Sequence, residues 1–298
     1  MPAIIINGKA IAAEIREEVR LETQRLKKRG ITPCLAVILV GENPASLSYV
    51  KGKQKALSEA GMEGRDIRLP ETASETELLS LIADLNADER VHGILVQLPL
   101  PAHISQIPVI NALDPRKDVD GFHPHSLGML FLGQPVFVPC TPKGIIVLLE
   151  KYNIPVSGKH VVIVGRSNIV GKPLSVLLSL RELNATVTLC HTGTVDLPSH
   201  TRQADILVVA AGKPGLIRGD MVKPGAAVID VGTNRVCDSS EKGYHLAGDV
   251  NFEEAAAVAG WITPVPGGVG PMTIAMLMRN VLEAAKGQNS QGQRTIVH

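Results

Sequence analysis

At 298 residues the chain is long enough for about two domains, each able to bury a core. The 30 Lys and Arg residues nearly balance the 29 Asp and Glu residues, which argues against nucleic acid and acidic membranes as partners and favours a small-molecule ligand. No apolar run approaches the roughly 20 residues of a membrane helix, and the first residues lack a signal-peptide pattern. The four cysteines are widely spaced without a C-x-x-C pair, so we expect a cytoplasmic protein with reduced cysteines.

The first half of the chain alternates strand and helix patterns. A capping box of Ser74 and Glu77 opens one of the helices. Such alternation predicts right-handed βαβ units and a parallel sheet. Strands are expected at residues 3–6, 34–40, 67–69 and 91–97.

A helix is expected from Pro44 to Ala60, because Asn43 suits its N-cap and Gly61 its end. At about 100° per residue, Lys53 lies in the middle of its inward face. Burying an ammonium costs free energy unless it is paired or becomes neutral, so Lys53 is a candidate acid or base. The alternative is a lysine whose head reaches the surface or meets a carboxylate. The predicted inward face consists of Ser46, Tyr49, Val50, Lys53, Leu57 and Ala60.

Polar side chains follow two of the predicted strands. Ligands of parallel sheets bind beyond the carboxyl ends of the strands. The helix with Tyr49 and Lys53 begins just past one such end, and Gln97 lies at another, so these three groups are expected to converge. Residues 98–141 are rich in Pro, Gly and His, which indicates an ordered functional loop more than a flexible linker.

This loop contains Asp118, Asp120, His123 and His125, residue types that bind metals. Their spacing fits neither a helix-borne pair nor a known loop site, so no metal is expected. Asp120 is instead interpreted as an acceptor for a ligand with several N–H donors.

The second half begins with a helix from Thr141 through Leu149 and continues as a second strand and helix series. A Gly-Pro turn then opens a last amphipathic helix that ends near Lys286. The glycines of this turn either form a connector or allow close backbone approach to a cofactor. The predicted strands are 161–164, 186–189, 206–210 and 227–231, with a short one near 261–263.

The segment HVVIVGRSNIVGKPLSVLL has the strand, glycine turn and helix of a dinucleotide-binding site. Gly165 and Gly171 match G-x-G-x-x-G with Ser167 in the middle place, so an ordinary βα turn stays an alternative. No carboxylate ends the next strand, where an NAD site normally has one. Arg166 and Thr192 could instead hold a 2′-phosphate, which favours NADP over NAD.

Five segments, YVKGKQKA, VQLPLP, DVDGF, VGRSNIVGKP and TPVPGGVGPMT, occur in this order. With them the chain closely resembles the bifunctional methylenetetrahydrofolate dehydrogenase/cyclohydrolase family over residues 4–286. The resemblance implies an α/β homodimer with two domains per chain: a catalytic folate-binding parallel α/β domain at 1–140, with the C-terminal helix (271–298) packing back on it, and a Rossmann-type NADP-binding domain at 141–270.

The resemblance also implies two reactions of one-carbon folate metabolism. The first passes a hydride from 5,10-methylenetetrahydrofolate to NADP⁺, and the second hydrolyses 5,10-methenyltetrahydrofolate to 10-formyltetrahydrofolate. Lys53 is implied to be the central group of the hydrolysis, supported by Tyr49 and Gln97. Asp120 is implied to hold the pterin ring, and Ser46 joins the substrate site.

Further residues follow from the same resemblance. Thr233 stands where many family members have an apolar residue, which bears on cofactor preference. Pro266, Gly267 and Gly268 are implied to line the substrate cleft. The residues implied to bind NADP are Gly165, Arg166, Ser167, Gly171, Thr192 and Thr233.

Two other functions remain open from the residues alone. A shikimate- or amino-acid-type NADP-dependent dehydrogenase would use Lys53 without any hydrolysis. A non-catalytic NADP-binding regulator would have no reason to keep a buried lysine.

Overall fold

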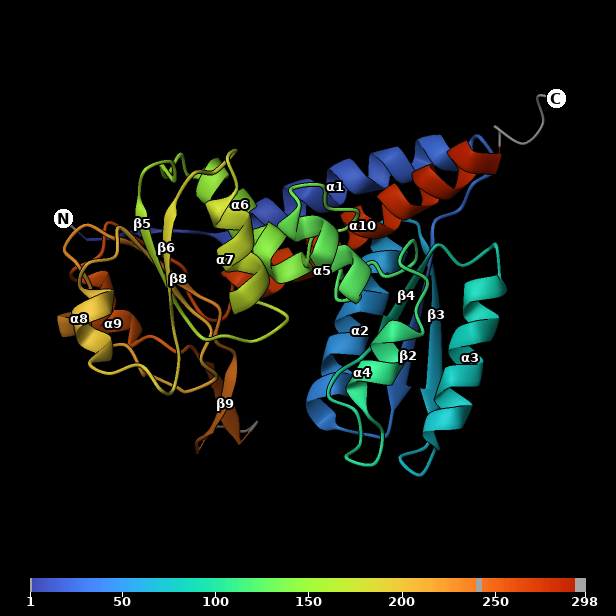
Figure 1. Cartoon of the computed structure of the whole chain (residues 1–298), viewed down its shortest axis with the longest axis horizontal. Coiled ribbons are helices and arrows are strands. Elements are labelled where there is room, and N and C mark those ends of the chain that lie inside the picture. Colours follow the sequence, from blue (N-terminus) through green and yellow to red (C-terminus); the bar gives the residue numbers. More distant parts are fainter. Residues whose placement is uncertain (1, 240–242, 293–298) are drawn as a thin grey trace. The chain divides into compact units, whose positions relative to one another are not determined.

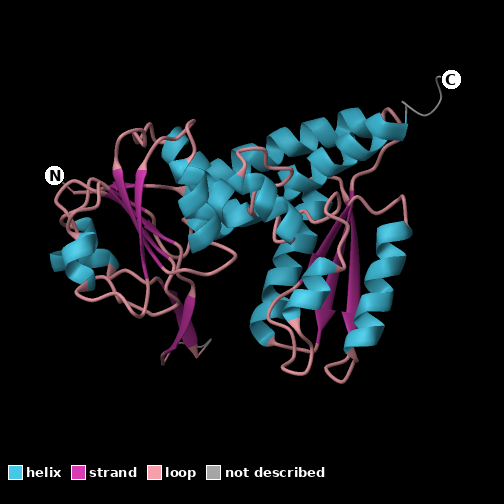
Figure 2. Ribbon diagram, viewed as in Figure 1, coloured by secondary structure: helices cyan, strands magenta, loops and turns pink. Residues whose placement is uncertain are grey.

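The computed structural model describes residues 2–239 and 243–292, which form two compact α/β units (Figures 1 and 2). One unit comprises Met1–Ala12 and Thr141–Thr273, and the other comprises Ala13–Cys140 and Ile274–His298. We call them the six-stranded unit and the three-stranded unit after their main sheets. Over the described ranges, no helix has the length and apolar character needed to cross a membrane.

The three-stranded unit has a parallel sheet in the order β3-β2-β4, with α2 and α3 on opposite sides of it (Figure 1). The central strand β2 is buried throughout because its seven residues, CLAVILV, are all apolar. The capping box of Ser74 and Glu77 is present at the start of α3. The elements are β2 (Cys34–Val40), α2 (Pro44–Glu59), β3 (Glu63–Leu69), α3 (Glu75–Ala87), β4 (Gly93–Val96), α4 (Gln106–Asn111) and α5 (Pro124–Phe131).

Most of two long helices, α1 (Gly8–Lys27) and α10 (Val269–Gly292), belongs to this unit, namely residues 13–27 and 274–292. They lie side by side (Figure 1), joined by the ion pair of Arg279 with Glu18, whose N and O atoms are 2.9 Å apart. The prediction that the C-terminal helix returns to the first domain is therefore confirmed.

The six-stranded unit has an all-parallel sheet in the order β1-β11-β8-β7-β5-β6. The chain passes from β5 to β6 on one side and then returns to β7 on the other, so the carboxyl end of β5 is a topological switch point, where ligands bind in such sheets. The elements are β1 (Ile4–Ile5), α6 (Cys140–Lys151), β5 (His160–Val164), α7 (Gly171–Ser179), β6 (Thr186–Cys190), α8 (Leu197–Thr201), β7 (Ile206–Val209), η1 (Gly219–Met221), β8 (Ala227–Asp230), β9 (Asn234–Cys237), β10 (Tyr244–Ala247), α9 (Phe252–Ala256) and β11 (Trp261–Ile262).

The N-terminal residues differ from the expected grouping. The sequence analysis places residues 1–12 with the first 140 residues, whereas β1 pairs with β11 at the edge of the six-stranded sheet. Tyr152 holds the same segment, since its hydroxyl accepts a hydrogen bond from the Asn7 amide (2.7 Å) and donates one to the Ile5 carbonyl (3.1 Å). A two-residue strand carries no sequence signal that tells which sheet it will join.

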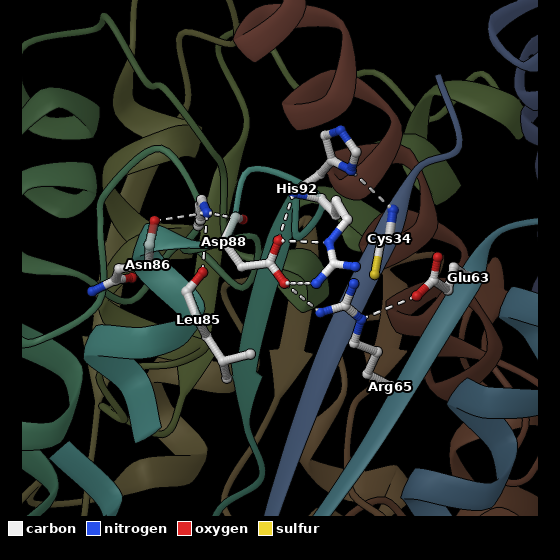
Figure 3. A network of polar contacts seen from close by, with 9 residues as sticks. Cys34, Glu63, Arg65, Leu85, Asn86, Asp88 and His92 are labelled. Carbon is white, nitrogen blue, oxygen red and sulfur yellow. Dashed lines mark hydrogen bonds and ion pairs between the residues drawn. The ribbon is translucent and has the colours of Figure 1, made fainter. Parts of the chain in front are cut away.

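A polar network ties together the amino ends of the three-stranded sheet (Figure 3). Arg65 binds Glu63 and Asp88 at 3.0 and 2.7 Å. The buried Lys117 donates from Nζ to the carbonyls of Leu85, Asn86 and Asp88 at 2.8–3.0 Å, which satisfies carbonyls that the end of α3 leaves open. Lys117 thereby also anchors the start of the loop that carries Asp118 and Asp120.

We expect Lys117→Met to lower the free energy of unfolding of this unit by roughly 2–3 kcal/mol, because it leaves three carbonyls without their donor. Hydrogen exchange of the buried β2 amides measures this quantity for the unit alone. Lys28→Met, which removes an exposed ammonium, is the control. Equal exchange rates in the two variants would contradict the anchoring role.

Candidate active site

Lys53 is buried on the inner face of α2, with 8% of its surface exposed. The Asn43 side chain accepts a hydrogen bond from the Ser46 amide (3.2 Å), which confirms the predicted start of the helix. Lys53 Nζ donates to Gln97 Oε1 at 2.9 Å, and Gln97 Nε2 donates to the Leu98 carbonyl at 2.8 Å. The amide of Gln97 is thus oriented with its oxygen toward the lysine.

Tyr49 does not share this environment, although the sequence predicts it on the inward face. It is 44% exposed, and no hydrogen bond to Lys53 occurs among the described residues. The buried stripe of α2 is narrower than the helical pattern indicates, and Tyr49 lies at its border. The other predicted inward residues are buried: Ser46, Val50, Lys53, Leu57 and Ala60.

Asp120 and Cys140 complete the surroundings of Lys53. Burial lowers the pKa of Lys53, and the negative charge of Asp120 partly opposes this shift. Burial likewise raises the pKa of Asp120, while the charge of Lys53 and a hydrogen bond from Cys140 act against it. The sequence analysis considered Cys140 only as one of four reduced cysteines and gave it no place in the site. The one sequence feature that points to a role for Cys140 is its position near the end of the loop of residues 98–141.

The backbone around this pair is held from α10. The buried Asn280 donates from Nδ2 to the carbonyls of Val119 (2.8 Å) and Val138 (3.1 Å), which lie next to Asp120 and near Cys140 in the chain. The position of the charged groups therefore depends on a polar side chain from the distant end of the sequence.

Asp118 has a structural part in the same loop. Its Oδ2 accepts hydrogen bonds from the His123 amide (2.7 Å) and the Ser126 hydroxyl (3.3 Å), and burial raises its pKa to about 6. His123 caps α5 by accepting from the His125 amide. Across residues 2–239 and 243–292, no group of three or more His, Cys, Asp or Glu residues is placed to hold a metal ion.

The six-stranded unit has a cavity of about 520 Å³ at the carboxyl ends of β5, β6 and β7. Its floor is the turn after β5, where Gly165 has φ +122° and a Cβ would overlap the Ala210 carbonyl oxygen. A Cβ on Gly171 would in turn overlap the carbonyl oxygen of Gly165. Only glycines allow this close approach, and it leaves space for a phosphate beside the backbone.

The charges that line the cavity suit a phosphorylated ligand. Arg166, Ser167 and Thr192 contribute to the wall as predicted, and Lys213 is a cation that the sequence analysis missed. His191 Nδ1 accepts from the Gly193 amide (3.0 Å), so a neutral His191 carries its proton on Nε2. None of the described lining residues is Asp or Glu.

The remaining predicted residues lie in the six-stranded unit outside this cavity lining. Thr233 is exposed and follows β8. Pro266 is exposed, and Gly267 accepts a hydrogen bond from the Lys9 amide at 2.9 Å. The glycine turn therefore acts at least as a connector to the start of α1. The structure thus brings together Lys53, Gln97 and Asp120 in one unit, and Gly165, Arg166, Ser167 and Thr192 in the other.

One α/β unit has a buried lysine site, and the other has a Rossmann-type pocket suited to a nucleotide. Together these features define the class of two-domain oxidoreductases. The family models for tetrahydrofolate dehydrogenase/cyclohydrolase match both parts, the catalytic domain at residues 6–120 and the NAD(P)-binding domain at residues 139–289. The chain belongs to this family, which confirms the resemblance carried by the five segments and the α/β fold class.

Individual relatives cover nearly the whole chain. It is 58% identical to the bifunctional protein FolD of Moorella thermoacetica over 286 residues, which are 96% of this chain and all of that protein. The bifunctional FolD structure from Campylobacter jejuni has a TM-score of 0.91 at 51% identity, covering 96% and 99% of the two chains. The Trypanosoma brucei enzyme, solved with NADP and an inhibitor, has a TM-score of 0.93 at 41% identity, covering 96% and 98%.

We expect Gly171→Ala to raise the Kd for NADP⁺ by about tenfold or more, because the new methyl group displaces the backbone of the glycine turn. Isothermal titration calorimetry measures the change. The control is Gly128→Ala in α5, where the added methyl group lies in open space. Binding of NADP⁺ at the wild-type Kd by the Gly171 variant would show that the turn does not form the phosphate site.

Proposed function

We propose that the protein oxidises 5,10-methylenetetrahydrofolate with NADP⁺ and hydrolyses the resulting 5,10-methenyl compound to 10-formyltetrahydrofolate. The observation that carries this proposal is the buried Lys53, hydrogen-bonded to Gln97 and placed beside Asp120, in a chain of the tetrahydrofolate dehydrogenase/cyclohydrolase family. The family membership also argues against the shikimate-type and regulator alternatives.

Lys53 is the proposed base of the hydrolysis. Its lowered pKa increases the neutral fraction, and a neutral amine can take a proton from the water that adds to the cationic methenyl carbon. The hydroxyl of this adduct then loses its proton as the carbonyl forms, one carbon–nitrogen bond breaks, and the departing nitrogen takes up a proton. The formyl group stays on the other nitrogen. Gln97 accepts a hydrogen bond from Nζ without adding a charge, so it orients the amine and does not favour the ammonium as strongly as a carboxylate would.

The substrate-binding residues are proposed as the resemblance implies them. Asp120 accepts hydrogen bonds from N–H groups of the pterin ring, and Ser46 lies on the same face of α2 as Lys53. Tyr49, at the border of the buried stripe of α2, is proposed to support Lys53, as the resemblance implies. Pro266, Gly267 and Gly268 are proposed to line the substrate site, as the resemblance implies.

The cofactor residues are assigned to NADP⁺, which accepts the hydride when it is bound. The glycines of the turn after β5 admit the pyrophosphate close to the backbone. Arg166 and Thr192 are proposed to hold the 2′-phosphate, with Lys213 as a second cation of the pocket. Thr233 is proposed to contact the cofactor as well.

We further propose a cytoplasmic homodimer. The resemblance supports the dimer. Cys34, Cys140, Cys190 and Cys237 form no disulfide bond, which supports a reducing compartment.

The proposed function is tested with 5,10-methylenetetrahydrofolate and either NADP⁺ or NAD⁺, following the reduced nicotinamide and the 10-formyl product separately. We expect both products, with NADP⁺ preferred. Lys53→Met should abolish hydrolysis of the methenyl compound and keep NADP⁺ binding, because it removes only the base. Lys51→Met, on the exposed face of the same helix, should keep both activities. Hydrolysis by the Lys53 variant at the wild-type rate would exclude Lys53 as the base.

The pH dependence of the hydrolysis gives a second prediction. A carboxylate at position 97 would favour the ammonium of Lys53 and raise its pKa. Gln97→Glu should therefore move the rise of kcat with pH upward, by about one to three pH units. Gln134→Glu at an exposed position is the control. A midpoint that stays in place or moves to lower pH would contradict a neutral Lys53 as the active form.

A further inference from the structure

One wall of the cofactor cavity is a loop without regular secondary structure. Residues 210–216 follow β7, and four of them line the cavity, namely Ala210, Ala211, Lys213 and Leu216. The loop contains Gly212 in the left-handed region, with φ +66°. Because the loop has no helix or strand of its own, contacts with residues outside it must hold the backbone conformation in which it lines the cavity.

The fully buried side chain of Asp249 binds this loop directly. Its Oδ2 accepts hydrogen bonds from the amides of Ala211 (2.6 Å) and Gly212 (2.8 Å). Its Oδ1 accepts from Asn234 Nδ2 (2.8 Å), one residue beyond Thr233. A single carboxylate thus connects the loop that follows β7 with the first residue of β9.

Asp249 is itself fixed by a second buried carboxylate. Asp230 Oδ1 accepts from the Asp249 amide and Oδ2 from the Val250 amide, each at 2.9 Å. A Cβ on Gly232 would overlap the Asp249 carboxyl group, so the backbone after β8 packs directly against it. The Asp249 carbonyl also accepts from the Ile217 amide (3.0 Å), at the far end of the loop.

We infer that Asp249 is a positioning residue of the cofactor pocket, which acts through the amides of Ala211 and Gly212 to hold the wall formed by residues 210–216. Asp249 is not among the residues that line the cavity. The identity of the ligand rests on the proposed function. The role of Asp249 rests on the hydrogen bonds above.

The test is the Asp249→Asn variant. Its single carbonyl oxygen cannot serve both the loop amides and Asn234, and its new amide group faces another amide donor. We expect the Kd for NADP⁺, measured by isothermal titration calorimetry, to rise by about tenfold or more. Hydrolysis of the methenyl compound, assayed without cofactor, should keep its kcat because Lys53, Gln97 and Asp120 lie in the three-stranded unit.

A double variant separates positioning from general stability. Asp249→Asn combined with Asn234→Asp exchanges the amide and the carboxylate, which restores a donor opposite an acceptor and should recover most of the affinity. Asn234→Asp alone places two carboxylates face to face and should bind NADP⁺ weakly. Asp205→Asn, at the residue before β7, replaces a carboxylate that binds the His160 amide and Lys223 away from the cavity lining, and it is the matched control.

Three outcomes would overturn the inference. The first is a wild-type Kd in the Asp249→Asn variant. The second is equal loss of NADP⁺ affinity and hydrolysis in the single and double variants, which would show a general structural role. The third is wild-type protein that does not bind NADP⁺. That result would remove the proposed function together with the inference, whereas the first two would leave the proposed function intact.

Discussion

Burying an ammonium costs free energy unless the group is paired, hydrogen-bonded or neutral. Each of these three conditions applies in part to Lys53. Burial favours the neutral amine, Asp120 favours the ammonium, and Gln97 accepts a hydrogen bond from either form. The pKa of Lys53 is therefore set by a balance of opposing effects, of which burial is the largest. A lowered pKa suits the base proposed for the hydrolysis, because the neutral amine is the form that accepts a proton.

This balance depends on distances that polar anchors maintain. The loop with Asp120 is held by Lys117 at its start, by Asp118 within it and by Asn280 from α10. Each anchor is buried and bonded to backbone groups, so displacing it would leave unsatisfied donors or acceptors. Because such displacement costs free energy, the loop keeps a defined shape although this part of it has no helix or strand.

The loop that lines the cofactor pocket is also held by buried polar side chains, and here both of them are carboxylates. There the backbone amides after β7 need acceptors, and Asp249 supplies them while Asp230 holds Asp249. Burial raises the pKa of Asp230 to about 6, so the bonds that Asp230 accepts as a carboxylate become weaker in mildly acidic solution. In both units the parallel strands place the loops, and buried polar side chains shape them.

The contrast between Lys53 and Asp249 shows what the sequence can predict. Lys53 lies on a capped helix whose period of about 100° per residue gives its direction without any knowledge of neighbours. The place of Gln97 in the site can also be predicted, because Gln97 lies at the end of a predicted parallel strand. Tyr49 lies at the border of the same stripe, where local periodicity no longer distinguishes inside from outside. The role inferred for Asp249 arises from contacts with residues 211, 212 and 234, which only the folded sheet brings together. The place of Cys140 beside Lys53 and the sheet that β1 joins were missed for the same reason, since their partners are distant in sequence.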